Sequence, residues 1–383
     1  MTTTNNLGLY LHIPFCVRKC KYCDFLSFGC DDSKVLSEYT KALMQEIKIR
    51  GKDWQDRQVD SIFIGGGTPS LLSPWDIGQL MDCLRDNFNI TEDAEITIEA
   101  NPATLTDEKL ERYLRKGINR LSIGVQSFEN YILQTLGRIH SKNDAYYSIK
   151  RAQKMGFENI NIDIMFGIPG QTMKMWKDTV RETIFMRPAH ISLYSLQVEE
   201  GTEFYKMIYQ DGTMKLPDEG LDRDMYHTAL RMMKTAGYEH YEISNGALSG
   251  RQSRHNLKYW SYEEYLGLGL GASSFANGIR FKNCDHMFDY IEAIKSNVAP
   301  VDAGSVEHFS EQEEMGVYTF TGLRKAEGIS LEKFRKTFRH NFFNVYDKSI
   351  VEKYKGKLIL DGDRLYLSEE GMDISNQIMA EFL

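Results

Sequence analysis

The sequence Cys16-Val17-Arg18-Lys19-Cys20-Lys21-Tyr22-Cys23 brings three cysteines together in one short loop. The loop follows directly after an apolar run, residues 7–13, and the dipeptide Pro14-Phe15. Thiolates at this spacing can all bind a single inorganic centre. Four ligands would saturate a tetrahedral zinc ion or a four-iron cluster, so three thiolates leave one position open.

A structural zinc site is the simplest alternative for this loop. It needs a fourth ligand, and the nearest candidates are Cys30 and His12. Structural zinc sites usually combine two short ligand pairs that are well separated in sequence. Cys83 and Cys284 each stand alone, so the chain offers no second pair. The spacing therefore favours a redox or cluster role, and a zinc-stabilised α/β protein is the weaker hypothesis.

The composition indicates a folded, acidic protein. The chain has 383 residues, of which 42% are hydrophobic, enough for two domains and a large core. Its formal net charge of -8 argues against extended nucleic-acid binding. Residues 1–6 carry neither a basic region nor an apolar signal core, and no apolar run approaches the roughly 20 residues of a membrane span. With too few cysteines for a disulfide scaffold, we expect a cytoplasmic protein with reduced thiols.

Strands and helices alternate regularly from residue 7 to residue 196. The pattern predicts strands at 7–13, 59–64, 95–100, 120–124, 159–166 and 190–196, with helices at 37–50, 74–88, 107–116, 141–155 and 173–186. Such alternation predicts βαβ units and a parallel sheet, with polar and Gly-rich segments at the edge where ligands bind. Because there are six units and not eight, the α/β fold is expected to be a partial (βα)6 TIM-like barrel, open at the side.

The remainder of the chain has a different character. Residues 218–235 are expected to be helical and 238–244 to extend the sheet, whereas the alternating glycines of 266–274 indicate close packing. From about residue 307 helix formers dominate, and a hairpin is expected at residues 357–367. We therefore expect a smaller, mainly helical, winged-helix-like C-terminal domain. The predicted domains are a barrel at 1–245 and a C-terminal region at 246–383, comprising a linker and motif segment, 246–300, and a small α-rich domain, 301–383.

The cysteine loop resembles a known family. The pattern CxxxCxxC, with an aromatic residue just before the last cysteine, is the signature of radical S-adenosylmethionine (SAM) proteins. Residues 9–16, Leu-Tyr-Leu-His-Ile-Pro-Phe-Cys, are similar to the HemN-like branch of that superfamily, and the resemblance covers essentially the whole chain. It implies that Cys16, Cys20 and Cys23 hold a [4Fe-4S] cluster whose fourth iron is chelated by SAM. It also implies an electron donor for the cluster and cleavage of SAM to methionine and a 5′-deoxyadenosyl radical.

The same resemblance implies a set of SAM contacts at the strand ends. Residues 65–69 follow the second strand, and consecutive glycines let backbone groups approach a ligand, although a tight turn is the alternative. The polar residues near the next strand ends could equally be outward strand residues or surface ion pairs. The residues that the resemblance assigns to the cluster surroundings or to SAM are Tyr10, Tyr22, Gly66, Gly67, Thr68, Glu99, Gln126, Arg138 and Asp163.

The segment His255-Asn256-Leu257-Lys258-Tyr259-Trp260 carries a second motif. A lone histidine is more often a core or surface residue than a metal ligand. However, His-Asn-x-x-Tyr-Trp matches the motif associated with heme binding in the heme chaperone branch of the HemN-like family. The resemblance therefore implies heme as a further cofactor, with His255 as its ligand among aromatic neighbours that suit a flat, apolar macrocycle. Cys30, Cys284 and His286 are the next candidates.

Two functions follow from the resemblance. The first is a heme chaperone that binds heme and transfers it to acceptor proteins, including respiratory, membrane-associated ones that would bring it to the inner membrane. The alternative is an oxygen-independent coproporphyrinogen III oxidase, in which an extra cysteine lies two residues after the third. Here that position is Phe25, and fifteen residues precede Cys16 where such oxidases have a longer extension. The chaperone is therefore the preferred interpretation.

Overall fold

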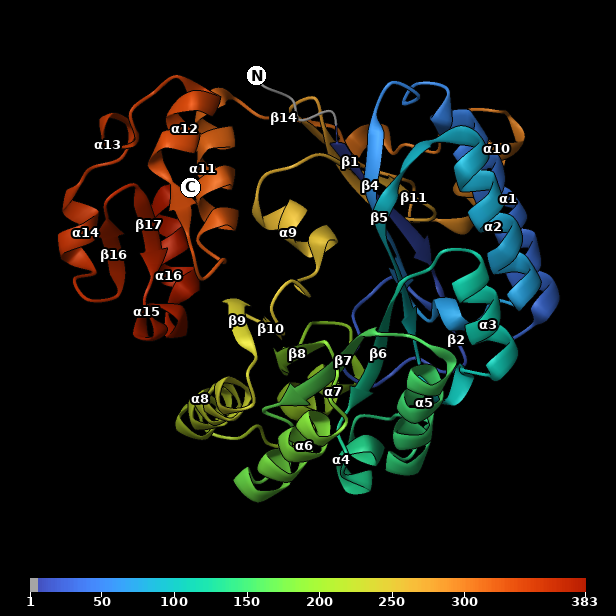
Figure 1. The fold of residues 1–383 in the computed structure, drawn as a ribbon, viewed down its shortest axis with the longest axis horizontal. Helices are drawn as coiled ribbons and strands as arrows, with labels where there is room; N and C mark the ends of the chain where they lie inside the picture. The colour runs from blue at the N-terminus through green and yellow to red at the C-terminus, as the bar shows by residue number, and fades with distance from the viewer. Residues whose placement is uncertain (1–5) are drawn as a thin grey trace.

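The computed structural model describes residues 6–383, and one 12-stranded sheet organises it (Figure 1). The expectation that residues 1–6 carry no signal segment falls, for residues 1–5, on a part of the chain outside this described range. The sheet order is β14-β13-β12-β11-β1-β4-β5-β6-β7-β8-β10-β9. Among the helices of residues 6–383, none combines the length and the apolar character needed to cross a membrane.

The centre of the sheet consists of the six predicted parallel strands. They are β1 (Asn6–Ile13), β4 (Gln58–Gly66), β5 (Asn89–Ala100), β6 (Arg120–Gln126), β7 (Asn159–Phe166) and β8 (His190–Ser195). Each pairs in parallel with the next one along the chain. This confirms the partial barrel and brings all six carboxyl ends to one edge of the sheet.

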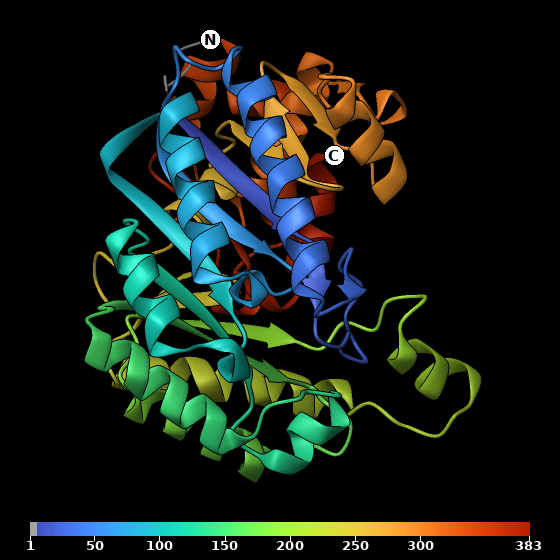
Figure 2. The same ribbon diagram turned by 90° about the vertical axis from the view of Figure 1, so that its right-hand side faces the viewer.

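The helices that follow these strands in the chain cover the outer face of the sheet. They are α1 (Ser33–Gly51), α2 (Pro74–Asn87), α3 (Asp107–Arg115), α4 (Asn130–Thr135), α5 (Lys142–Met155), α6 (Met173–Phe185) and α8 (Glu219–Thr235). Figure 2 shows the blue helices α1 and α2 side by side across the strands. Because helices cover it, β1 buries almost all its residues, with Leu7, Leu9 and Leu11 completely inaccessible.

Both edges of the parallel sheet are extended by further strands, which pair antiparallel except where β11 meets β1. These are β10 (Asn245–Ala247) and β9 (Glu239–Glu242) beyond β8, and β11 (Tyr265–Leu268), β12 (Ser273–Ala276), β13 (Ile279–Lys282) and β14 (Glu307–His308) beyond β1. Of these, β11 runs parallel to β1 itself. A Cβ on Gly269, whose φ is +98°, would lie 2.6 Å from the His12 carbonyl oxygen, so close packing requires glycine there.

The C-terminal part has a core of its own. Its elements are α11 (Glu311–Gly322), β15 (Ile329–Ser330), α12 (Leu331–Phe338), α13 (Phe342–Val345), α14 (Ser349–Lys353), β16 (Leu358–Asp361), β17 (Arg364–Leu367), α15 (Glu369–Asp373) and α16 (Ser375–Met379). Phe334, Phe338 and Phe342 pack at its centre. The predicted hairpin is confirmed as β16 and β17, which pair antiparallel.

The segment between barrel and C-terminal core contributes to both neighbours. It contains α9 (Arg254–Trp260) and α10 (Met287–Lys295) besides strands of the large sheet. The predicted boundary after residue 245 falls within β10, and β11 to β13 of segment 246–300 pair beside β1. The division into 1–245 and 246–383 stays a prediction. Figure 1 places residues 311–383 on the opposite side of the sheet from α1 and α2.

Candidate functional site

The cysteine loop lies at the carboxyl end of β1. Cys16 belongs to β2 (Phe15–Cys16), which pairs with β3 (Phe28–Gly29), and the Cys30 N–H donates to the Cys16 carbonyl at 2.8 Å. This pairing closes the loop on itself. The side chains of Cys16, Cys20 and Cys23 are free thiols at intermediate exposure, so they can be reached by a ligand. Burial raises the thiol pKa of both Cys16 and Cys23.

Two side chains from other elements reach the sulfur atoms. The Thr68 hydroxyl donates to Cys16 Sγ at 3.5 Å, and Arg138 Nη1 donates to Cys20 Sγ at 3.5 Å. In residues 6–383, no three His, Cys, Asp or Glu side chains are grouped so that they could hold one metal ion. The thiolates of a four-iron cluster each bind a different iron, so the three cysteines need not converge on one point.

The glycine stretch after β4 packs directly against the cysteine loop. Gly67 N–H donates to the Ile13 carbonyl at 2.8 Å, and Thr68 N–H donates to the Phe15 carbonyl at 2.7 Å. A Cβ on Gly67 would lie 2.6 Å from the Phe15 carbonyl oxygen, and Gly66 has a φ of +111°. Both positions therefore require glycine. The Gly66 N–H donates to Glu99 Oε2 at 3.1 Å, which links the stretch to the end of β5.

Two carboxylates converge near the ends of β5 and β7. Asp163 accepts hydrogen bonds from Asn161 Nδ2 at 2.8 Å and from the Ser122 hydroxyl at 3.2 Å. Burial in the barrel, followed by the nearby charge of Asp163, raises the pKa of Glu99 to about 8. Burial also raises the pKa of Asp163. A pair of desolvated carboxylates is costly when both are ionised, so this place suits a cationic ligand.

Gln126 and Arg138 complete this edge of the barrel. Gln126 ends β6 with a φ of +66°, which is rare for a residue with a side chain. Its Oε1 is buried and has no hydrogen-bond partner among residues 6–383. Arg138 Nη2 donates to the Gly124 carbonyl, while its Nε has no partner within the same described range. Both side chains therefore keep unused polar atoms in the interior of the site.

The two tyrosines predicted near the cluster have different surroundings. Tyr10, on β1, shares a hydrogen bond with His12 Nδ1 at 2.9 Å, and His12 Nε2 contacts the Leu26 carbonyl at 2.8 Å. Tyr22 packs instead against a separate apolar cluster that contains Leu136 and Phe204. The structure thus brings the predicted residues Tyr10, Tyr22, Gly66, Gly67, Thr68, Glu99, Gln126, Arg138 and Asp163 to the strand ends around the cysteine loop, and their contacts with SAM stay predictions.

His255 occupies an interior position and not the wall of a cavity. It is completely buried at the start of α9, where Glu95 accepts the N–H groups of Arg254 and His255 at 3.1 Å. Its Nδ1 contacts the Ser61 hydroxyl at 3.0 Å, and its Nε2 contacts the Tyr259 hydroxyl at 2.8 Å. Burial lowers the pKa of His255 to about 3, so the ring is neutral. Its predicted role as heme ligand stays a prediction, because in this conformation both ring nitrogens are occupied.

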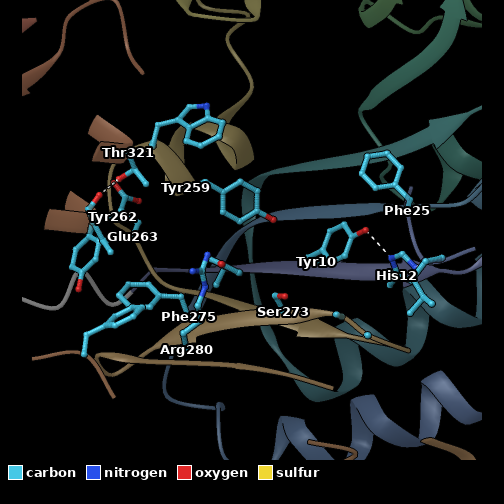
Figure 3. Close-up of a pocket in the computed structure, with 17 residues that line it drawn as sticks. Tyr10, His12, Phe25, Tyr259, Tyr262, Glu263, Ser273, Phe275, Arg280 and Thr321 are labelled. Atoms are coloured by element: carbon cyan, nitrogen blue, oxygen red, sulfur yellow. Dashed lines mark hydrogen bonds between the residues drawn. The ribbon is translucent and has the colours of Figure 1, made fainter. Parts of the chain in front are cut away.

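An aromatic pocket of about 460 Å³ lies beside this helix (Figure 3). It is walled by β1, the cysteine loop, the end of α9, β11 to β13 and α11, with His12 and Leu26 on the side of the cysteine loop. Tyr262 Oη and Trp260 Nε1 are buried and have no partner among the described residues. Lining residues that sequence reasoning did not select are Tyr262, Tyr265, Phe275, Arg280, Phe309 and Thr321. The high density of aromatic residues in segment 259–275 is the sequence signal that could have identified most of them.

Comparisons with known proteins agree with this geometry. Residues 10–183 match the family model of the Radical SAM superfamily, and residues 314–374 match that of the HemN C-terminal domain. Among solved structures, coproporphyrinogen III oxidase (HemN) from Escherichia coli has a TM-score of 0.86, with 22% identity, covering 98% of this chain and 89% of that chain. That likeness shows a shared fold.

Curated relatives extend over nearly the whole chain. The protein named heme chaperone HemW from Lactococcus lactis is 36% identical, with 98% of this chain and 96% of the relative covered. The HemW of Bacillus subtilis is 37% identical, with 98% of each chain covered. The HemW of Escherichia coli is 40% identical over 70% of this chain and 69% of its own. The chain therefore belongs to the radical SAM superfamily, whose members carry a [4Fe-4S] cluster and SAM, and within it to the HemW family.

Proposed function

We propose that this protein is a heme chaperone, which binds heme, transfers it to acceptor proteins and carries a [4Fe-4S] cluster with exchangeable SAM. The observation that carries this proposal is the aromatic pocket between the cysteine loop, α9 and the C-terminal core. The relatives covering nearly the whole chain are named heme chaperones, which supports the same function.

The cysteine loop and the strand ends fit the cluster and SAM. Cys16, Cys20 and Cys23 would supply the three thiolates, and Thr68 and Arg138 would donate hydrogen bonds to sulfur. A reduced cluster supplies an electron to the sulfonium of SAM when both are bound. The chain itself offers the Gly66–Gly67 backbone for close approach, the Glu99 and Asp163 carboxylates for cationic groups, and the unpartnered Gln126 Oε1.

The pocket fits part of a porphyrin. Its volume of about 460 Å³ is within the range of small-molecule sites, and its wall is mainly aromatic. Exposed Phe25, Ser273 and Arg280 mark the side where the pocket meets solvent. The Arg280 guanidinium is suited to pair with a propionate there. A heme held with one edge outside is one that an acceptor protein can take.

The proposal also specifies the class of acceptor proteins. We infer that they include respiratory, membrane-associated proteins, and that the chaperone works in the cytoplasm and reaches the inner membrane through such a partner. The acidic net charge of -8 supports a protein partner over nucleic acid. An electron donor for the cluster is a further partner that radical SAM membership requires.

The first test separates the chaperone from the alternative, an oxygen-independent coproporphyrinogen III oxidase. Anaerobically reconstituted protein is incubated with coproporphyrinogen III, SAM and a reductant, and in parallel titrated with heme. We expect heme binding and no protoporphyrinogen IX. Stoichiometric decarboxylation would overturn the chaperone assignment. An oxidase must hold the four carboxylates of its substrate. In the described part of the chain, Arg280 is the one Arg or Lys that lines the pocket, so the pocket offers few cationic partners for them.

The second test asks whether the aromatic pocket is the heme site. Trp260→Ala removes a pocket wall that is stacked under Arg324 at 4.4 Å, and we expect heme affinity to fall at least tenfold. Trp75→Ala is the matched control, because Trp75 is 63% exposed on α2, outside the pocket. Equal heme affinity in both variants would place the heme elsewhere. Transfer of heme from each variant to an apo-acceptor, followed by absorbance, measures the chaperone step.

A further inference from the structure

The α9 motif contains a second group able to bind iron, and this one borders the pocket. Tyr259 lies one helical turn after His255, so the two side chains share a face of α9. Tyr259 lines the pocket, whereas His255 is completely buried behind it. The structure therefore presents a phenol, and not an imidazole, to anything that enters.

The orientation of Tyr259 is held by its neighbours. Its hydroxyl lies 2.8 Å from His255 Nε2, and His255 Nδ1 is in turn 3.0 Å from the Ser61 hydroxyl. The ring of Tyr259 packs edge-on against Tyr265 with centroids 4.6 Å apart. Figure 3 shows its hydroxyl end pointing toward Tyr10 on the facing strand. A chain of hydrogen bonds from β4 through His255 thus fixes where the phenol oxygen lies.

We propose that Tyr259 Oη is the axial ligand of ferric heme in this pocket and that His255 is the residue that positions it. This inference rests on the proposed heme binding and names the atom responsible. Tyrosinate oxygen is an established ligand of ferric heme iron. A ligating group whose far side is hydrogen-bonded is held in one orientation and has its basicity tuned by that partner.

The proton balance of this ligation follows from the hydrogen bonds. As the iron–oxygen bond forms, the phenol proton leaves to solvent. His255 in the Nε2–H tautomer then donates to the bound oxygen, while the Ser61 hydroxyl donates to Nδ1. Both contacts already exist at hydrogen-bond distance, so no side chain has to move. Ser61, on β4, is also completely buried, which keeps this donor away from competing water.

Tyr262 and Tyr265 are the other pocket phenols on this side, and they serve as controls. Tyr262 Oη has no partner among the described residues, and Tyr262 packs against Phe275 at 4.7 Å. Neither phenol has an imidazole hydrogen-bonded to it within residues 6–383. On this side of the pocket, Tyr259 is therefore the phenol with an imidazole partner, whereas Tyr10 on the facing strand is hydrogen-bonded to His12 at 2.9 Å.

The experiment titrates wild type, Tyr259→Phe, Tyr265→Phe and His255→Gln with ferric heme and, separately, with metal-free protoporphyrin IX. Absorbance, electron paramagnetic resonance and resonance Raman spectra identify the axial ligand. In wild type and Tyr265→Phe we expect the charge-transfer bands and Fe–O stretch of phenolate ligation. Tyr259→Phe should lose them and bind ferric heme at least tenfold more weakly, with unchanged affinity for the metal-free ring. His255→Gln should retain phenolate ligation with a shifted Fe–O stretch.

Three kinds of outcome would contradict the ligand assignment, the role of His255 or heme binding itself. An imidazole or thiolate signature in wild type, or phenolate bands that persist in Tyr259→Phe, would overturn the ligand assignment while leaving heme binding intact. A His255→Gln spectrum identical to wild type would remove His255 from the positioning role. Absence of heme binding to wild type would instead contradict the proposed function itself. The isosteric Tyr259→Phe change preserves ring packing, and its circular dichroism spectrum verifies folding.

Discussion

The edge of the barrel around the cysteine loop and the aromatic pocket beside it are built in opposite ways. The barrel edge brings together polar residues, such as Glu99 and Asp163. They lie near the ends of strands that belong to successive βα units. The pocket collects aromatic residues from segments as distant in sequence as Tyr10 and Phe309. The first is suited to a charged cofactor and the second to an apolar ring. Tyr10 and His12 belong to both, because they lie in the C-terminal half of β1 and line the pocket.

This difference teaches which kind of change each region tolerates. A polar site on strand ends depends on single charged groups, so removing one alters affinity without disturbing the scaffold. A pocket between separate cores depends on how those cores pack. The barrel core and the C-terminal core are distinct clusters, and α11 of the latter supplies Val317 and Thr321 to the pocket wall. Disturbing the C-terminal core should therefore affect heme and spare the cluster.

The largest expected effect breaks the barrel edge alone. Replacing Cys16, Cys20 or Cys23 by Ala should remove essentially all iron from anaerobically reconstituted protein, because a cluster needs each of its few thiolate ligands. Cys30→Ala is the matched control: it should retain about four irons per chain. Iron and sulfide analysis with absorbance measures this. One zinc per chain, without iron absorbance, would contradict the radical SAM interpretation of the loop.

A change in the C-terminal core should separate the two regions. Phe334 is completely buried and contacts Phe338 and Phe342 with ring centroids 5.0 Å apart. Phe334→Ala should destabilise this core by about 3–5 kcal/mol through lost burial and a cavity. Denaturant unfolding followed by circular dichroism measures it, and Phe288→Ala, 70% exposed on α10, is the control. If the variant loses cluster iron as readily as heme, the two regions are not independent.

The smallest expected effect sharpens the role of the carboxylates. Because the pKa of Glu99 is about 8, the folded protein holds a proton on it between roughly pH 4.5 and 8 that the unfolded chain releases. The Glu99 contribution to stability is thus lost as pH rises through this window. A cationic ligand favours the carboxylate, so SAM affinity should rise with pH up to about 8 and then level off.

Glu99→Gln tests this dependence. The variant should bind SAM about tenfold more weakly at high pH, with that pH dependence flattened, because an amide cannot gain charge. Anaerobic calorimetry across the pH range measures both quantities. Glu92→Gln, an exposed position near the other end of β5, should behave as wild type. A steep profile that survives in Glu99→Gln would assign the titration to another group, with Asp163 the next to replace.

Much of the barrel could be predicted from the sequence because its signals are local. Apolar periodicity indicated the six parallel strands and their helices, and the spacing of Cys16, Cys20 and Cys23 indicated the cluster loop. Strand ends of a parallel sheet meet at one edge by topology alone. Glu99, Gln126 and Asp163 could therefore be grouped before their positions were known.

Only the tertiary structure decided what faces the pocket. The motif at 255–260 singled out His255, yet its burial behind Tyr259 depends on Ser61 and Phe63 of β4, nearly two hundred residues earlier. Likewise, β11 joins the sheet beside β1 through a pairing that spans most of the chain. Local sequence determines strand, helix and motif, because these rest on short-range periodicity. Which side of a residue meets solvent is a long-range property, set by the elements that pack against it.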